Sequence, residues 1–149
     1  AIGREKFENA GQASALQMVR GDATCVAAAD ASFDVVTISF GIRNVLGVDA
    51  ALREMHRVLK PGGRLLVLEF SLPANALLRW GYLLYFRNVL PRIGGLVSGD
   101  SHAYRYLNET VESFPYGGAF CELMRNANFS NVKAVSLTFG IATIYRGDK

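Results

Sequence analysis

Two short stretches of this chain are mostly apolar and contain no run of polar residues. The first spans Val35–Phe40 and the second spans Leu65–Phe70. Apolar runs of this length are typical of strands that are buried on both faces, as in a parallel sheet. We therefore expect two strands of such a sheet.

The segment between these runs has the pattern of an amphipathic helix over Val48–Leu59, with apolar residues on one side and charged residues on the other. Asp49 lies near its start, where a negative charge suits the helix dipole. Pro61 disfavours helix at the residue before it, and the following glycines permit a tight turn. Strand, helix, turn and strand together predict a βαβ unit with parallel strands.

The pattern changes over residues 71–115, where we expect a helical insertion. Its first part, Leu77–Arg87, is apolar and aromatic with interspersed arginines. Helical spacing then predicts two helices, over Tyr104–Ser113 and Ala119–Asn126. The fold class predicted at this stage is therefore α/β.

Both ends of the chain carry weaker signals. The opening segment to Asn9 resembles the end of a helix, and Ala15–Arg20 alternates loosely enough for a strand. Val132–Thr138 and Ile141–Tyr145 are joined by a tight connection and predict an antiparallel hairpin. The chain begins at Ala1 without a methionine or a signal peptide, so we expect it to start partway through a domain.

Composition narrows the class of protein. The chain has 149 residues, of which 50% are hydrophobic, enough for the core of one domain. Its two cysteines are far apart and predict neither a disulfide framework nor a zinc site, so we expect no metal and a reducing, cytoplasmic setting. The net charge of +3 is spread along the chain and does not indicate nucleic-acid binding. The longest uncharged stretch, Ala134–Tyr145, is too short to span a membrane.

Several motifs resemble one enzyme family, the ubiquinone/menaquinone biosynthesis C-methyltransferases. The motifs are Phe33-Asp34 with Thr37–Val45, Arg53–Arg64 followed by Leu65–Ser71, Leu90–Gly94, Gly99–Ser101, Tyr104–Leu107 and Tyr145–Gly147. A helix followed by Leu-Lys-Pro-Gly-Gly is common to many S-adenosylmethionine-dependent methyltransferases. The Ser-Phe-Gly-Ile-Arg-Asn run at residues 39–44 is more specific to the quinone family.

The resemblance implies a partial, Rossmann-like class I methyltransferase sheet, with parallel strands and the closing hairpin. The family's glycine-rich loop and the acidic residue after its second strand have no counterpart in residues 1–149. We therefore expect residues 1–149 to be the C-terminal part of one methyltransferase domain, and expect them alone to bind S-adenosylmethionine poorly. We also expect Val35–Phe40 to have an open strand edge, which favours a homo-oligomer or pairing with another chain.

Three residues match cofactor contacts of the family. Asp22 and Ala23 match the position beside the adenine of S-adenosylmethionine, and Ser39 matches a second contact at the end of a strand. Ligands of such sheets bind at the carboxyl ends of parallel strands. The alternatives are that Asp22 caps a turn and that Ser39 is a buried serine bonded to the backbone.

The resemblance places catalysis at Arg43 and Asn44. The reaction it implies is methylation of a ring carbon of a polyprenyl quinol, for which a guanidinium stabilises the phenolate and an amide binds the ring. The alternative for Arg43 is a surface ion pair. Asp100 and Tyr104 are expected on the substrate side, and the proton acceptor is a water, one of these two residues, or His102.

Residues 77–97 also suggest an amphipathic lid. An apolar and aromatic face with arginines can contact a bilayer and admit a polyprenyl tail, whereas an ordinary core helix has a similar composition. We expect a cytoplasmic protein with peripheral contact at the inner membrane. Two alternative functions stay open: a methyltransferase for another small molecule, and a non-catalytic fragment that serves as a binding or assembly module.

Overall fold

The computed structural model describes residues 17–92 and 101–149, and for residues 101–105 only the course of the main chain. Four strands form one mixed sheet, β1 (Phe33–Ser39), β2 (Leu59–Phe70), β3 (Ser130–Leu137) and β4 (Ala142–Asp148), in the order β1-β2-β4-β3. β1 and β2 are parallel, and β4 is antiparallel to both β2 and β3. The predicted α/β class, the parallel pair and the closing hairpin are all confirmed.

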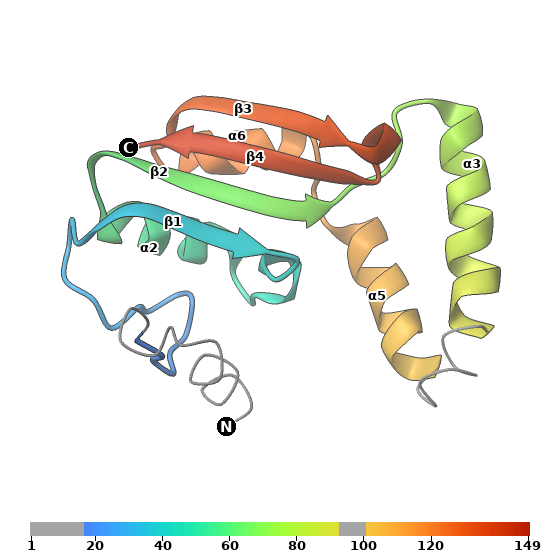
Figure 1. Ribbon diagram of the computed structural model, residues 1–149, viewed down its shortest axis with the longest axis horizontal. Coiled ribbons are helices and arrows are strands. Elements are labelled where there is room, and N and C mark those ends of the chain that lie inside the picture. The colour runs from blue at the N-terminus through green and yellow to red at the C-terminus, as the bar shows by residue number, and fades with distance from the viewer. Residues whose placement is uncertain (1–16, 93–100) are drawn as a thin grey trace, which may run out of the picture.

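Two helices cover one face of this sheet (Figure 1). α2 (Val48–Val58) lies behind β1 and β2, and α6 (Gly118–Asn126) lies behind β3 and β4. The core lies between the sheet and these helices, because alternate residues of β2 and β4 point toward them. Its fully buried members include Leu52, Leu65, Val67, Phe120, Met124 and Tyr145.

The strand β1 departs from the sequence prediction. Uniform apolarity predicted a strand buried on both faces, yet Val35 is 51% exposed and Phe33 is 43% exposed. The physical reason is its place at the edge of the sheet, with no helix on the outer face among the residues that the structure describes. An edge of this kind can pair with a further strand.

The connection from α2 to β2 is tighter than a separate turn. β2 begins at Leu59, directly after the helix, and the Lys-Pro-Gly-Gly motif forms an irregular start to the strand. Gly62 has φ of +78°, and a Cβ on Gly63 would lie 2.8 Å from the carbonyl oxygen of Lys60. Both positions therefore require glycine. The glycines that predicted a separate tight turn lie instead within the first residues of β2.

The insertion forms a helical arm at the end of the sheet where β1 and β2 terminate (Figure 1). Its first helix is α3 (Ala76–Leu84), which continues through the π-helical turn η2 (Tyr85–Val89), and its second is α5 (Ser101–Ser113). The ring of Tyr82 stacks on Phe86 with centroids 4.9 Å apart. The arm therefore stands at the carboxyl ends of the parallel strands.

Of the elements predicted near the N-terminus, the structure covers only a part. Residues 17–20 form no strand, so that part of the predicted Ala15–Arg20 strand is wrong. Their alternation was loose, and in the structure they precede a short turn closed by a bridge between Asp22 and Cys25. The predicted helix end before Asn9 lies outside the described residues, as do residues 15 and 16.

Candidate functional site

The loop that leaves β1 begins with a strained turn. Phe40 has a φ of +50°, which is uncommon for a residue with a side chain. The chain then forms a short 3-10 helix, η1 (Ile42–Asn44). Ile42 is completely buried and anchors η1 in the core, so the neighbouring Arg43 and Asn44 are held at the carboxyl end of the strand.

Arg43 forms a nearly buried ion pair with Glu69 at the end of β2. The Nη1 atom of Arg43 donates to Oε1 of Glu69 at 2.7 Å and to the carbonyl oxygen of Phe40 at 2.7 Å. The side chain of Glu69 is fully buried and that of Arg43 is 10% exposed. Glu69 also accepts hydrogen bonds from the main-chain N–H groups of Arg43 and Phe70. These bonds fasten the loop to β2.

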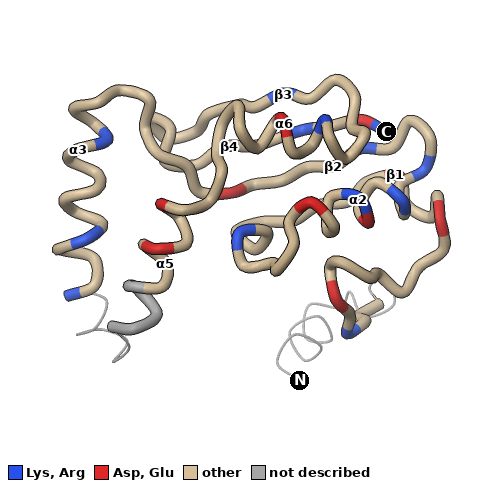
Figure 2. Tube along the Cα trace, turned by 180° about the vertical axis from the view of Figure 1, so that it is seen from behind, with Lys and Arg blue, Asp and Glu red and all other residues tan. Residues whose placement is uncertain are grey.

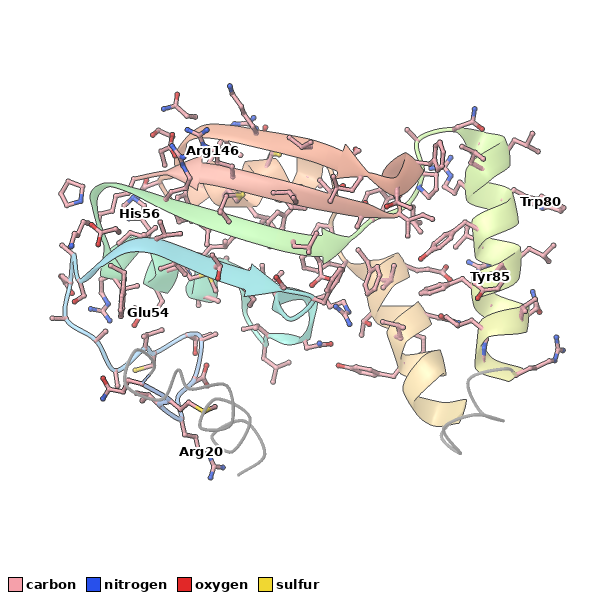
Figure 3. The ribbon with its side chains drawn as sticks, in the orientation of Figure 1. Arg20, Glu54, His56, Trp80, Tyr85 and Arg146 are labelled. Carbon is pink, nitrogen blue, oxygen red and sulfur yellow. The ribbon has the colours of Figure 1, made fainter. Side chains whose placement is uncertain are left out.

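A cavity of about 680 Å³ lies beside this loop. Two segments line it, Arg20–Ala23 and Asn44–Leu46. Figure 3 shows Arg20 below the sheet, on the side of the segment that precedes β1. The cavity thus joins a segment before β1 to the loop after it.

Asp22 lines this cavity and also shapes its own turn. Its Oδ1 atom accepts hydrogen bonds from the N–H and the hydroxyl of Thr24, both at 2.8 Å. Both bonds lower the pKa of Asp22, and the bond from the main-chain N–H has the larger effect. The carboxylate therefore stays charged at neutral pH. A charged acceptor at the rim fits an amine donor such as the exocyclic amine of adenine.

The structure brings together three of the predicted site residues, because Asp22, Ala23 and Asn44 line the same cavity. Ser39 is exposed at the end of β1 and is not among the lining residues, so the alternative of a buried serine is wrong. The side chain of Arg43 turns toward Glu69, as a nearly buried ion pair rather than a surface one.

The structure gives little or no detail for the residues that were predicted on the substrate side. Asp100 lies outside the described residues, and for His102 and Tyr104 the structure describes only their place on α5. Among the side chains that the structure describes, those of residues 17–92 and 106–149, no group of three histidine, cysteine or acidic side chains is placed to hold a metal ion.

Two further side chains contact this loop: Glu69, which the sequence offers as a weaker candidate for a pocket wall, and Tyr106, which was not predicted. Tyr106 of α5 donates a hydrogen bond from its hydroxyl to Oδ1 of Asn44 at 3.1 Å. The sequence analysis selected Tyr104 instead, although residues two apart on a helix point in nearly opposite directions. Glu69 was also informative, because a single acid in an apolar strand requires a buried partner.

The arm carries its own contacts and a large exposed apolar surface. Asn108 of α5 donates to the carbonyl oxygen of Phe86, and Arg87 pairs with Glu112. Trp80 is 64% exposed and points away from α5 (Figure 3). Of the helices in the described part of the chain, none combines the length and apolarity needed to cross a bilayer.

Comparison with solved structures shows the fold. A SAM-dependent methyltransferase from Thermotoga maritima superposes with a TM-score of 0.63 at 22% identity, over 94% of this chain and 68% of that one. A SAM-dependent methyltransferase from Aquifex aeolicus superposes with a TM-score of 0.63 at 14% identity, over 97% of this chain and 60% of that one. The sheet and its helices therefore have the fold of this enzyme class.

Comparison by sequence shows the family. The ubiquinone/menaquinone biosynthesis C-methyltransferase UbiE of Roseobacter denitrificans is 47% identical over 147 residues, which is 99% of this chain and 59% of that protein. The chain therefore spans about three fifths of the length of this relative. The model of the ubiE/COQ5 methyltransferase family matches residues 1–149. On these grounds the chain belongs to the ubiE/COQ5 methyltransferase family.

Proposed function

We propose that this protein transfers the methyl group of S-adenosylmethionine to a ring carbon of a polyprenyl quinol, as part of ubiquinone or menaquinone biosynthesis. The observation that carries the proposal is the shared cavity, in which the cofactor-side residues Asp22 and Ala23 meet the substrate-side residue Asn44. The 47% identity to a relative named for this reaction supports it.

The chemistry sets the task of the site. The methyl donor is a sulfonium, whose departing sulfur becomes neutral, so no acid is needed to assist it. The acceptor carbon becomes nucleophilic when a proton leaves a ring oxygen of the quinol. The protein must therefore hold the ring in line with the methyl group, exclude water and stabilise charge on the oxygen.

The residues of the cavity fit the two ligands in different ways. Asp22 accepts from the adenine amine, and the small Ala23 leaves room beside the ring. Asn44 hydrogen-bonds a ring oxygen of the quinol, next to the apolar side chains of Val45 and Leu46. S-adenosylmethionine, when bound, supplies the methyl group.

Arg43 acts less directly on the substrate in this proposal than an unpaired cation would. Its charge is shared with the buried Glu69 in an ion pair of 2.7 Å. Arg43 therefore serves as a donor with fixed orientation, and the proton acceptor is a water or a group of the insertion such as Asp100, His102 or Tyr104.

The test is a methyl-transfer assay on the complete protein encoded by the gene, with benzoquinol and naphthoquinol substrates offered separately. Asn44→Ala removes an exposed amide without disturbing the core, and we expect kcat/KM to fall at least about tenfold. Asn126→Ala, an exposed asparagine at the end of α6, is the matched control. Methylation of neither quinol by the unmodified protein, or full activity of Asn44→Ala, would overturn the proposal.

We further propose that α3 contacts the surface of an anionic membrane, from which the polyprenyl substrate is taken. Three of its large apolar side chains are exposed: Leu77 at 76%, Trp80 at 64% and Leu84 at 50%. No acid lies between Glu69 and Asp100 in the sequence, which carries Arg79 on α3 and Arg92 beyond it, whereas Arg87 is paired with Glu112. Figure 2 shows basic but no acidic positions along α3 and its continuation. Exposed apolar side chains with cations nearby favour binding to the surface of an anionic membrane.

Trp80 is the single tryptophan of the chain and reports on this contact. We expect its fluorescence to shift to shorter wavelength with vesicles that contain phosphatidylglycerol, and not with phosphatidylcholine alone. Leu77→Ser should weaken the binding, whereas Val135→Ser, which removes a side chain of similar exposure on β3, should not. An unshifted spectrum with anionic vesicles would refute the contact.

A further inference from the structure

Asn44 lines the cavity, and its main chain is fixed whereas its side chain is not held by packing. Arg43 ties the loop to Glu69 and also donates to the carbonyl oxygen of Phe40, and the neighbouring Ile42 is fully buried. The side chain of Asn44, in contrast, is exposed to solvent. Its orientation therefore depends on a side-chain contact rather than on packing.

That contact comes from the helical arm. The hydroxyl of Tyr106 donates to Oδ1 of Asn44 at 3.1 Å, and the two residues are separated by 62 positions in the sequence. Within the described residues, this is the one hydrogen bond that the structure shows for the side chain of Asn44. Tyr106 is 50% exposed, so its hydroxyl does not serve the packing of a core.

We propose that Tyr106 is a positioning residue, which orients the Asn44 carboxamide so that its NH2 group faces the cavity and one N–H can donate to a ligand oxygen. An amide has one accepting oxygen and two donating hydrogens on its nitrogen. When the Tyr106 hydroxyl is bonded to the amide oxygen of Asn44, the groups that Asn44 still offers to the cavity are its N–H donors. The ligand group they suit is an acceptor, such as the ring oxygen of a quinol as it loses its proton.

The contact also links the arm to the site. α5 supplies Tyr106 and packs on η2, the continuation of α3, through Asn108 and the Arg87–Glu112 pair. A displacement of α5 would therefore release the Asn44 side chain. The amide is oriented only while the arm occupies the place seen here.

This inference rests on the proposed function, and a double-mutant cycle separates the two. In the complete protein, Tyr106→Phe removes only the hydroxyl, and we expect kcat for methyl transfer to fall about tenfold, the equivalent of one hydrogen bond. The KM for S-adenosylmethionine and the midpoint of thermal unfolding should stay unchanged. In the Asn44→Ala background, Tyr106→Phe should have no further effect.

Tyr116→Phe removes a hydroxyl from a half-buried tyrosine outside the cavity and serves as the matched control. A second readout does not need turnover: the side-chain amide signals of Asn44 in a ¹⁵N spectrum should move in Tyr106→Phe and not in Tyr116→Phe. Additive effects of the two changes, or unmoved amide signals, would overturn the role of Tyr106. Full activity of Asn44→Ala would instead overturn the proposed function.

Discussion

The sheet with α2 and α6 and the helical arm use apolar side chains in opposite ways. In the first region, large side chains such as Phe120, Leu52 and Leu65 are fully buried. In α3 no residue is buried, although most of its residues are apolar. Burial of apolar surface is the main force that stabilises a fold. The sheet region therefore holds itself together, whereas the apolar surface of α3 is available to a ligand or a surface.

The largest expected difference concerns one aromatic ring in each region. Phe120→Ala removes a fully buried ring that contacts Phe114 and Tyr145, and we expect it to lower the free energy of unfolding by about 3–5 kcal/mol. Trp80→Ala removes a larger but exposed ring and should change it by less than about 1 kcal/mol. Urea denaturation followed by circular dichroism measures both. Equal effects would contradict the contrast between the regions.

A smaller effect is expected at the start of α3. The side chain of Asn75 accepts hydrogen bonds from the N–H groups of Leu77 and Leu78 and so caps the helix. Asn75→Ala should destabilise α3 by about 1 kcal/mol, because two N–H groups lose their acceptor. Faster hydrogen exchange should be confined to α3, and Asn75→Ser should restore protection. Faster exchange throughout the sheet would show that the arm is not independent.

The smallest effect at neutral pH concerns a charged contact of the sheet region. Hydrogen bonds from the side chain of Arg57 lower the pKa of Glu54 from 4.5 to about 2, and a hydrogen bond from the N–H of Val26 adds a smaller part of this shift. A lowered carboxyl pKa stabilises the fold above pH 4.5, and this contribution is lost as the pH falls toward 2.

Glu54→Gln should therefore flatten the fall in the unfolding midpoint between pH 4.5 and about 2. Glu122→Gln, which alters an exposed pair with Arg125 on α6, is the control and should leave that slope in place. An unchanged slope in Glu54→Gln would remove Glu54 from the acid response.

Much of the fold followed from local patterns. The helix at α2 was predicted because its apolar residues recur at helical spacing, and β2 because an apolar run follows a Pro-Gly-Gly turn. The burial of β1 could not be predicted in this way. A uniformly apolar strand has the same sequence at an edge as in the middle of a sheet, and only its neighbours decide the exposure of Val35.

The site shows the same division. The resemblance carried by residues 39–44 directed attention to Arg43 and Asn44, of which Asn44 lines the cavity. It did not reveal that Glu69 pairs with Arg43, or that Tyr106 rather than Tyr104 contacts Asn44. Those contacts join residues 26 and 62 positions apart, so no local spacing encodes them.

By itself, the sequence determined which segments become helices and strands and which loop carries the polar side chains, because these depend on neighbours within a few residues. The tertiary structure alone decided that Asp22 and Asn44 share a cavity, that the charge of Arg43 is shared with Glu69, and that Leu77, Trp80 and Leu84 of α3 are exposed. Each of these outcomes depends on how distant segments pack, and packing is set by the whole chain at once.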